Sequence, residues 1–394
     1  NKPNVREAIT IVAGVLLFAV VVCIYGEFQR GNIAELQLWQ WVPGVSIAFR
    51  VEPLGLLFAL VASLLWPVTS LYAIGYMRAH HEQNQTRFYM CFAVAISAVM
   101  GVALAANLIT LFVFYEVLSI ATYPLVTHSG TDKARRSGRV YLGILLGTSI
   151  AFLLFAILVT ALAADTLEFT PGGILHDQVP VWLATVLLPL FVYGIGKAAL
   201  MPFHRWLPAA MVAPTPVSAL LHAVAVVKAG VFAILKICVY IYGFDLLQSV
   251  SSTQILLYMT GFTVVVASVI AMRQDNLKAR LAYSTVGQLA YITMGALLAN
   301  AAGVTGASMH LAVHAMAKIT LFFCAGAIMV AAHETQISRM HGLGRQMPLT
   351  FAAFFIASLS IVGLPPTGGT WSKWYLLTGT VDSGQWLMMV CLLL

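Results

Sequence analysis

One carboxylate and four lysines lie deep inside apolar stretches of this sequence. Glu116 lies in LFVFYEVLSIATYPLV, and the lysines are Lys197 in GIGKAALMP, Lys228 in HAVAVVKAG, Lys318 in HLAVHAMAKITLFF and Lys373 in GTWSKWYLL. An intramembrane charge costs roughly 2.5 kcal/mol or more, so such residues usually serve a function. Burial and mutual repulsion oppose full ionisation of the set, which suits a track of groups that accept and release protons.

Histidines accompany two of these lysines. His310, His314 and Lys318 follow an i, i+4, i+8 spacing and are expected to form one stripe on one helix face. Zinc binding by His-x3-His needs a third ligand, and the sequence offers only a lysine there, so no metal site is expected. Histidine titrates near neutrality, which favours a polar track for protons. His222 lies roughly 120° around the helix from Lys228, and it is either a pathway residue or a hydrogen-bonded core histidine.

Lys197 is the expected partner of Glu116, on grounds of chemistry and depth. The alternatives are a static salt bridge between helices and, for Lys197, an amine that reaches the membrane surface. Pro202 cannot donate to the carbonyl of Ala198, so a helix through this region should leave that oxygen unpaired. Such a backbone group is tolerated only against protein or water, so we expect a hydrated interior site.

A second segment combines helix breakers with one lysine. The stretch GLPPTGGTWSKW holds Pro365, Pro366 and Gly368 shortly before Lys373. It lies five apolar segments after the segment of Lys197, so the two have opposite orientations in a membrane. Interrupted helices at matching positions of two inverted halves indicate a transport site.

The composition identifies a multi-span membrane protein, because 60% of the 394 residues are hydrophobic and 9% are charged, against roughly 25% charged in soluble domains. At about 20 residues per crossing, the chain has eleven full apolar segments and a truncated twelfth. We find no strand alternation, so the predicted fold is an all-α polytopic helical bundle rather than a barrel.

Charge placement supports this interpretation and excludes a nucleic-acid partner. The net charge is +7, and most cations fall in alternate connections between the apolar segments, which is the positive-inside pattern of cytoplasmic loops. The five cysteines lie scattered in apolar stretches without a CxxC pair, and no phosphate loop, dinucleotide motif or nucleophile–base motif occurs. We therefore expect no cofactor and no catalytic chemistry of the chain's own.

The predicted organisation has three parts. Residues 1–86 hold N-terminal transmembrane helices, residues 87–242 form the first five-helix repeat, and residues 253–394 form the second repeat. The sequence begins with NKPNVREAIT and stops within the apolar QWLMMVCLLL, so we expect a fragment of a longer protein, truncated in its second repeat.

Five motifs together resemble the proton-conducting antiporter-like subunits of respiratory complex I, membrane-bound hydrogenases and Mrp-type multisubunit Na⁺/H⁺ antiporters. They are FYEVLSIATYPLV, GIGKAALMPFHRWLPAAMVAPTPVSALLHAVAVVKAG, LKARLAYSTVGQLAY, HLAVHAMAKITLFF and GLPPTGGTWSKW. The likeness is greatest to the D-type Mrp subunit. The resemblance implies fourteen helices with two inverted repeats, so the first, the last and part of the thirteenth helix lie outside this sequence. It places the family's central axis on Glu116, Lys197, Lys228, Lys318 and Lys373, with His310 and His314 beside it.

The expected function is proton translocation by a subunit of a hetero-oligomeric complex in the bacterial inner membrane, most simply an Mrp-type Na⁺/H⁺ antiporter. One alternative is a redox-driven complex I or hydrogenase subunit. Another is the membrane subunit of an energy-coupled inorganic carbon uptake complex, and a last one is a scaffold that does not conduct. Partner subunits decide between these functions, because this chain holds no redox ligands.

Overall fold

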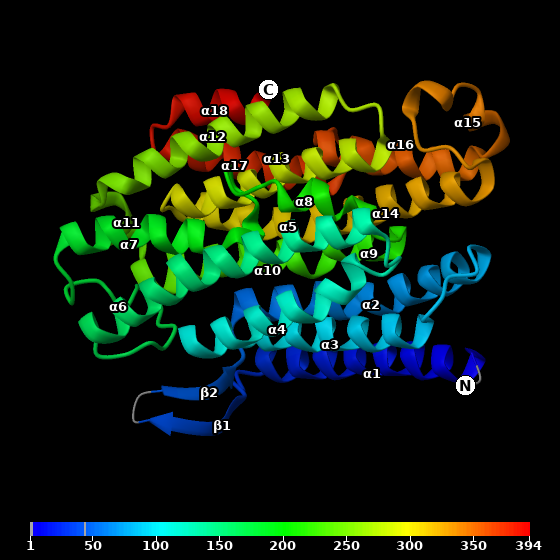
Figure 1. Cartoon of the computed structure of the whole chain (residues 1–394). Helices are drawn as coiled ribbons and strands as arrows, with labels where there is room; N and C mark the ends of the chain where they lie inside the picture. The colour runs from blue at the N-terminus through cyan, green and yellow to red at the C-terminus, as the bar shows by residue number, and fades with distance from the viewer. Residues whose placement is uncertain (1–2, 43–44) are drawn as a thin grey trace.

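The computed structural model describes residues 3–42 and 45–394 and is a bundle of roughly parallel helices with one hairpin at its edge (Figure 1). The helices of the first half are α1 (Pro3–Gln29), α2 (Pro53–Ala79), α3 (Gln85–Ala103), α4 (Leu108–Val126), α5 (Asp132–Thr148), α6 (Phe155–Ala163), α7 (Val181–Gly194), α8 (Trp206–Ala209), α9 (Thr215–Ala219), α10 (Val226–Lys236) and α11 (Phe244–Ser249). Those of the second half are α12 (Ser251–Met272), α13 (Leu277–Leu297), α14 (Ala301–Ala332), α15 (Leu343–Gln346), α16 (Pro348–Val362), α17 (Gly368–Asp382) and α18 (Trp386–Leu393).

Short π- and 3₁₀-helical segments interrupt or join several of these helices. They are η1 (Ser149–Leu154), η2 (Gly196–Ala198), η3 (Ala210–Val212), η4 (Leu220–Val224), η5 (Ile237–Tyr242) and η6 (Ile337–Arg339). Among the described residues, seven helical stretches are long and apolar enough to cross a membrane, and two shorter apolar helices, α7 and α16, precede breaks. The all-α membrane bundle expected from the sequence, with two discontinuous helices, is confirmed.

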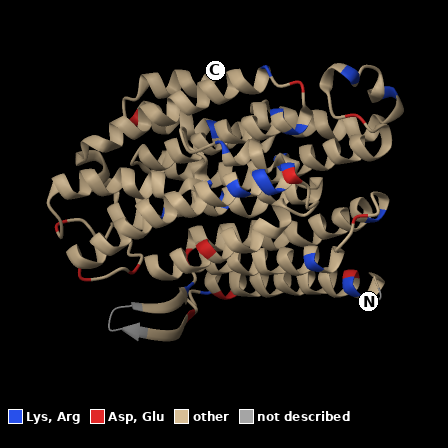
Figure 2. Ribbon diagram, viewed as in Figure 1, with Lys and Arg blue, Asp and Glu red and all other residues tan. Residues whose placement is uncertain are grey.

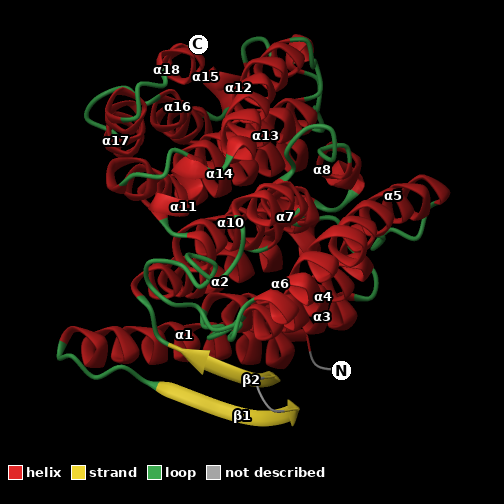
Figure 3. Ribbon diagram, turned by 90° about the vertical axis from the view of Figure 1, so that its left-hand side faces the viewer, coloured by secondary structure: helices red, strands yellow, loops and turns green. Residues whose placement is uncertain are grey.

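The middle of the bundle is formed by helices from both halves of the chain. Figure 3 looks along the helices and places α10, α13 and α14 between the N-terminal helices α1–α4 and the C-terminal helices α16–α18. Helix α14 packs against α13, α17 and α16 of its own half, and also against α2, α9, η4 and α10. A side chain on α14 is therefore placed to join the two halves.

The ends of the bundle differ in charge. Figure 2 shows that the connections at the end that holds the N-terminus carry most of the lysines and arginines, while the loops at the opposite end carry mainly acidic residues. Four cations expected in one connection, Lys133, Arg135, Arg136 and Arg139, lie instead in the first turns of α5. The charge asymmetry remains, because these turns lie at the same end. We call this end cytoplasmic and the other end outer.

The two interrupted spans break in different ways. Helix α7 ends at Gly194, and η2 follows with Lys197 in its middle. The break therefore precedes Pro202, and the expected unpaired carbonyl within a continuous helix is wrong. Close packing is the cause that the structure supplies: a Cβ on Gly194 would lie 2.4 Å from the backbone nitrogen of Leu153. In the second interrupted span, α16 ends with Gly363 at φ 88°.

Two consecutive prolines then separate α16 from α17. Pro365 and Pro366 lie in the turn after Gly363, and α17 begins at Gly368. Proline cannot continue a helix because it lacks the backbone N–H. The break expected from GLPPTGG is therefore confirmed at the expected residues.

A β-hairpin was not expected from the sequence. Strands β1 (Glu35–Val42) and β2 (Val45–Arg50) pair antiparallel, with Leu36 opposite Phe49, and they lie at the outer end beside α1 (Figures 1 and 3). The stretch ELQLWQW alternates polar and apolar residues, which is typical of a half-buried strand. The hairpin is tied to the bundle, since the N–H of Arg50 donates to the carbonyl of Leu104 at 2.8 Å.

A buried ion pair fixes the outer end of the bundle below this hairpin. The Nζ of Lys236 lies 3.0 Å from the carboxylate of Glu52, and the two side chains are 0% and 9% exposed. The same amine donates to the carbonyl of Ala105 at 2.6 Å and lies 3.9 Å from the ring centroid of Phe169. Lys236 does not reach for solvent, so its position is set by Glu52 at the start of α2.

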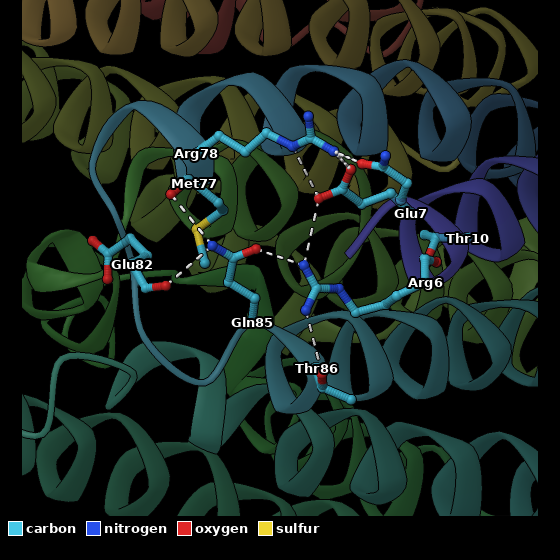
Figure 4. Close-up of polar contacts among 9 residues, drawn as sticks. Arg6, Glu7, Thr10, Met77, Arg78, Glu82, Gln85 and Thr86 are labelled. Carbon is cyan, nitrogen blue, oxygen red and sulfur yellow. Dashed lines mark hydrogen bonds and ion pairs between the residues drawn. The ribbon is translucent and has the colours of Figure 1, made fainter. Parts of the chain in front are cut away.

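At the cytoplasmic end a polar cluster joins α1 to α2 and α3 (Figure 4). Glu7 is buried and accepts two hydrogen bonds from the guanidinium of Arg78. Arg6 donates to the side chain of Gln85 at 2.6 Å and to Thr86 at 3.3 Å. These bonds anchor α1, which otherwise exposes a mostly apolar surface.

We expect Glu52→Gln to destabilise the protein, because it leaves the amine of Lys236 buried without a counter-charge. Breaking a buried pair from one side costs roughly 3–5 kcal/mol. The measurement is thermal unfolding of the purified protein in detergent. The control is Glu35→Gln, which removes a carboxylate that is 61% exposed and 3.7 Å from Arg50; exposed pairs contribute about 0–1 kcal/mol. Equal unfolding temperatures for the two variants would contradict this role of Glu52.

Candidate functional site

Lys197 is fully buried at the break of the first interrupted span. Its Nζ donates to the carbonyl of Tyr115 at 2.7 Å and to the hydroxyl of Ser119 at 2.6 Å, both on α4. The amine also lies 3.1 Å from the ring centroid of Tyr115, and the hydroxyl of that tyrosine accepts from the backbone N–H of Lys197 at 3.1 Å. Tyr115 therefore holds both ends of the lysine.

Glu116 lies beside this contact but does not form the expected ion pair with Lys197. In the part of the chain that the structure describes, both carboxylate oxygens of Glu116 are buried without a hydrogen-bond partner. The reason is the helix geometry of α4: Tyr115 and Ser119 share one face, and successive residues are rotated by about 100°. The carboxylate is thus near enough to act electrostatically on Lys197 without touching it.

Lys228 and His314 join the two halves of the chain. The Nζ of Lys228 on α10 lies 2.5 Å from the Nδ1 of His314 on α14, and both side chains are 0% exposed. The rings of His314 and His310 stack with centroids 5.7 Å apart and planes at 23°. The expected stripe along α14 is therefore present, and it begins at a direct contact with the first half.

His310 is held from two sides by residues that the sequence did not identify. Its Nε2 lies 2.9 Å from the Oε1 of Gln288 on α13, and its Nδ1 lies 3.0 Å from the Oγ of Ser372 on α17. Gln288 was visible in the sequence as a single amide in the apolar run TVGQLAYITMG. Ser372 directly precedes Lys373, and only the packing of α17 on α14 shows its role.

Lys318 occupies the cytoplasmic side of the stripe. Its Nζ donates to the hydroxyl of Ser284 at 2.8 Å and to the carbonyl of Leu281 at 3.2 Å, both on α13. The side chain is 0% exposed. The spacing of His310, His314 and Lys318 correctly predicted their shared face, although each contacts a different helix.

Lys373 is the most accessible of these lysines. Its Nζ donates to the carbonyl of Val362 at 3.0 Å, which is the last residue of α16, and lies 5.1 Å from the ring centroid of Tyr291. The amine therefore caps the half-helix that precedes the break. The remaining expected pathway residue, His222, lies in η4, and its side chain is outside the described part of the structure.

The arrangement is a connected set of groups that can bind protons. Lys228, His314 and His310 follow one another through short contacts, Lys318 continues the stripe, and Tyr291 lies between His310 and Lys373, with its ring centroid 5.8 Å from that of His310. Among the residues with described positions, no three His, Cys, Asp or Glu side chains gather as metal ligands would. The set can hold and pass protons through hydrogen bonds and bridging water.

Comparisons with known proteins agree with this architecture. A family described as "NADH:quinone oxidoreductase/Mrp antiporter, TM" matches residues 105–394. A Desulforudis audaxviator (strain MP104C) protein named NADH-quinone oxidoreductase subunit N is 33% identical, covering 100% of this chain and 78% of that protein. An Alkalihalophilus pseudofirmus protein, named as one of the subunits of a Na(+)/H(+) antiporter, is 32% identical, but its match covers 92% of this chain and 46% of the relative.

A solved structure has the same fold. The Mrp complex from Dietzia sp. DQ12-45-1b contains a chain that superposes with a TM-score of 0.88 at 24% identity, covering 100% of this chain and 72% of that one. Fold, family match and relatives therefore lead to one assignment: the chain is a multi-pass membrane protein that belongs to the NADH:quinone oxidoreductase/Mrp antiporter transmembrane family.

Proposed function

We propose that this chain is a proton-translocating subunit of a multisubunit membrane complex. The observation that carries the proposal is the 2.5 Å contact between Lys228 and His314, which joins buried titratable groups of the two halves. Intramembrane ionisable side chains are expensive to keep, and two of them in direct contact mark an ion or proton pathway. The comparisons support the class, because the relatives are named as subunits of quinone oxidoreductases and cation/proton antiporters.

The proposed pathway runs from the break in the first half to the break in the second. Protons reach Lys197 near Glu116, pass to Lys228, and continue through His314 and His310 to Lys373. Close packing supports the first step, since a Cβ on Gly230 of α10 would lie 2.4 Å from the backbone nitrogen of Ala198. Helix α10 is thus packed directly on the segment that carries Lys197.

Glu116 acts in this scheme by its charge rather than by contact. Its field raises the proton affinity of Lys197, and a shift of η2 along α4 changes the distance between them. Such a change alters the proton affinity of the lysine without breaking a salt bridge. Lys318 takes part as a side branch on the cytoplasmic side of His314, and His222 remains a proposed pathway residue.

We also propose the repeat organisation that the sequence predicts. Residues 1–86 precede the repeats, residues 87–242 form the first and residues 253–394 form the second. The two interrupted spans, each with one lysine next to its break, support this division. In an inverted arrangement the break of one repeat opens toward one side of the membrane and that of the other toward the opposite side.

For the driving reaction, our proposal is Na⁺/H⁺ exchange by an Mrp-type complex in the bacterial inner membrane, with this chain as its D-type subunit. The five motifs support it, and the relative named for a Na(+)/H(+) antiporter strengthens that support. The second candidate is a redox-driven complex, favoured by the relative named NADH-quinone oxidoreductase subunit N. The energy-coupled carbon uptake complex is a third candidate from the motifs alone.

We expect Lys228→Ala, in the intact complex reconstituted into liposomes, to lower proton flux by roughly tenfold or more, which equals about 1.4 kcal/mol on the limiting barrier. The reason is that His314 loses its partner from the first half. Flux is measured with a pH-sensitive dye under an imposed gradient. The control is Lys133→Ala at the exposed start of α5. Wild-type flux in an assembled Lys228→Ala complex would refute the proposed pathway.

The partner subunits and the sodium dependence should agree with each other. We expect the chain to co-purify with small hydrophobic subunits, and proton flux in liposomes to require sodium on the opposite side. Mass spectrometry of the purified complex and flux with and without sodium measure the two. Co-purification of iron–sulfur proteins would instead establish the redox-driven alternative, and a stoichiometric soluble zinc protein would establish the carbon uptake complex.

A further inference from the structure

The contacts of His310 define a small polar site between three helices. Gln288 comes from α13, His310 from α14 and Ser372 from α17, and they are 8%, 1% and 0% exposed. The Nε2 of His310 lies 2.9 Å from Gln288 and its Nδ1 lies 3.0 Å from Ser372. The hydroxyl of Ser372 also donates to the carbonyl of Gly369 at 3.1 Å. Every polar atom of the ring therefore has a partner within hydrogen-bond distance.

The number of protons in these bonds decides what the site can hold. A serine hydroxyl has one proton, and a neutral imidazole has one N–H. When Ser372 donates to Gly369, its oxygen can only accept from Nδ1. When Gln288 presents its Oε1, Nε2 must donate as well. The observed set of contacts is therefore fully satisfied when both ring nitrogens carry protons, which is the imidazolium form.

Both neutral forms are accommodated by rotations alone. With the proton on Nε2, the hydroxyl of Ser372 turns from Gly369 and donates to Nδ1. With the proton on Nδ1, the amide of Gln288 turns and donates to Nε2, because an amide carries a donor and an acceptor. Neither change moves the ring or a backbone. A buried polar atom left without a partner would cost about 1–3 kcal/mol, and this site avoids that cost in all three protonation states.

We propose that Gln288 and Ser372 are positioning residues that make His310 a two-sided proton station. Binding of a proton at one nitrogen turns the imidazole into imidazolium, and loss of the proton from the other nitrogen regenerates a neutral ring. Nothing else is exchanged and no bond between heavy atoms forms or breaks. The inference rests on the proposed function and adds the two residues that let this histidine change its proton without being trapped in one tautomer.

The surroundings of His310 contain other titratable groups that act on it. Tyr291 lies on α13, His314 on α14 itself, Lys228 on α10 and Lys373 on α17. The neighbouring part of α14 faces α2 and η5 across apolar residues that include Leu54, Leu57 and Val239. Among these described neighbours there is no carboxylate, so a new one at position 288 would be the first anion in contact with the ring.

The test compares Gln288→Glu and Ser372→Ala in the assembled complex in liposomes, with proton flux measured across a range of pH. Glutamate keeps the size of glutamine but offers only acceptors, so it favours the imidazolium, and the pH profile should move upward by about one unit. Ser372→Ala removes an acceptor of the imidazolium, so its profile should move downward. A role in packing alone predicts no opposite shifts. The matched control is Gln254→Glu, whose amide bonds Gln385 at 3.1 Å away from His310.

The outcomes separate this inference from the proposed function. Profiles of Gln288→Glu and Ser372→Ala that both coincide with wild type, while Lys228→Ala still lowers flux, would overturn the inference and leave the function standing. Wild-type flux in Lys228→Ala would overturn both. If one variant does not assemble, the direction of the other's shift decides the inference by itself.

Discussion

The burial of lysine amines in an apolar bundle is the constraint on which the rest of the structure depends. An amine without a partner at this depth is costly, so each one must end on an acceptor. The structure meets this requirement with a different acceptor each time, and the partner always comes from another helix or half-helix. The contacts are Lys197 to Tyr115 and Ser119, Lys228 to His314, Lys236 to Glu52 and Ala105, Lys318 to Leu281 and Ser284, and Lys373 to Val362.

Only one of these amines is neutralised by a carboxylate. Lys236 with Glu52 forms an ion pair at the outer end, where it stabilises the fold and has no continuation along α14. The others end on carbonyls, hydroxyls or an imidazole, which can bind an ammonium group but do not oppose its loss of a proton. A carboxylate in direct contact would hold the proton more tightly. The buried track is therefore built from partners that leave the proton exchangeable, and the ion pair lies outside it.

The sequence was sufficient for features that depend on local periodicity. The stripe of His310, His314 and Lys318 follows from helix geometry alone, and the break at Pro365 and Pro366 follows from the chemistry of proline. The partner of Lys197 could not be derived in this way. Whether it meets Glu116 or the adjacent face of α4 depends on the rotation of one helix against another, and the packing of Gly194 and Gly230 sets that rotation.

Contacts between distant helices and a small hairpin were also beyond the sequence argument. Ser372 looks like any small helix residue until α17 is packed on α14, and Gln288 shows only that some polar partner is needed. The hairpin was missed for another reason. The alternation in ELQLWQW was present, but the choice between helical bundle and barrel left no place for a single pair of strands at the membrane edge.

The two breaks differ in a way that gives the track a direction. Lys197 is closed on all sides and is bound by a residue from the middle of an intact helix, whereas Lys373 is partly exposed and caps the end of a half-helix. The cap of Lys373 exists only while α16 and α17 keep their present angle, because its acceptor belongs to one half-helix and its amine to the other. A movement at this break thus changes the environment of Lys373 and, through Ser372, the hydrogen bonds of His310 at the same time. One displacement of α17 is sufficient to couple release of a proton at the accessible end with a change of protonation in the buried middle.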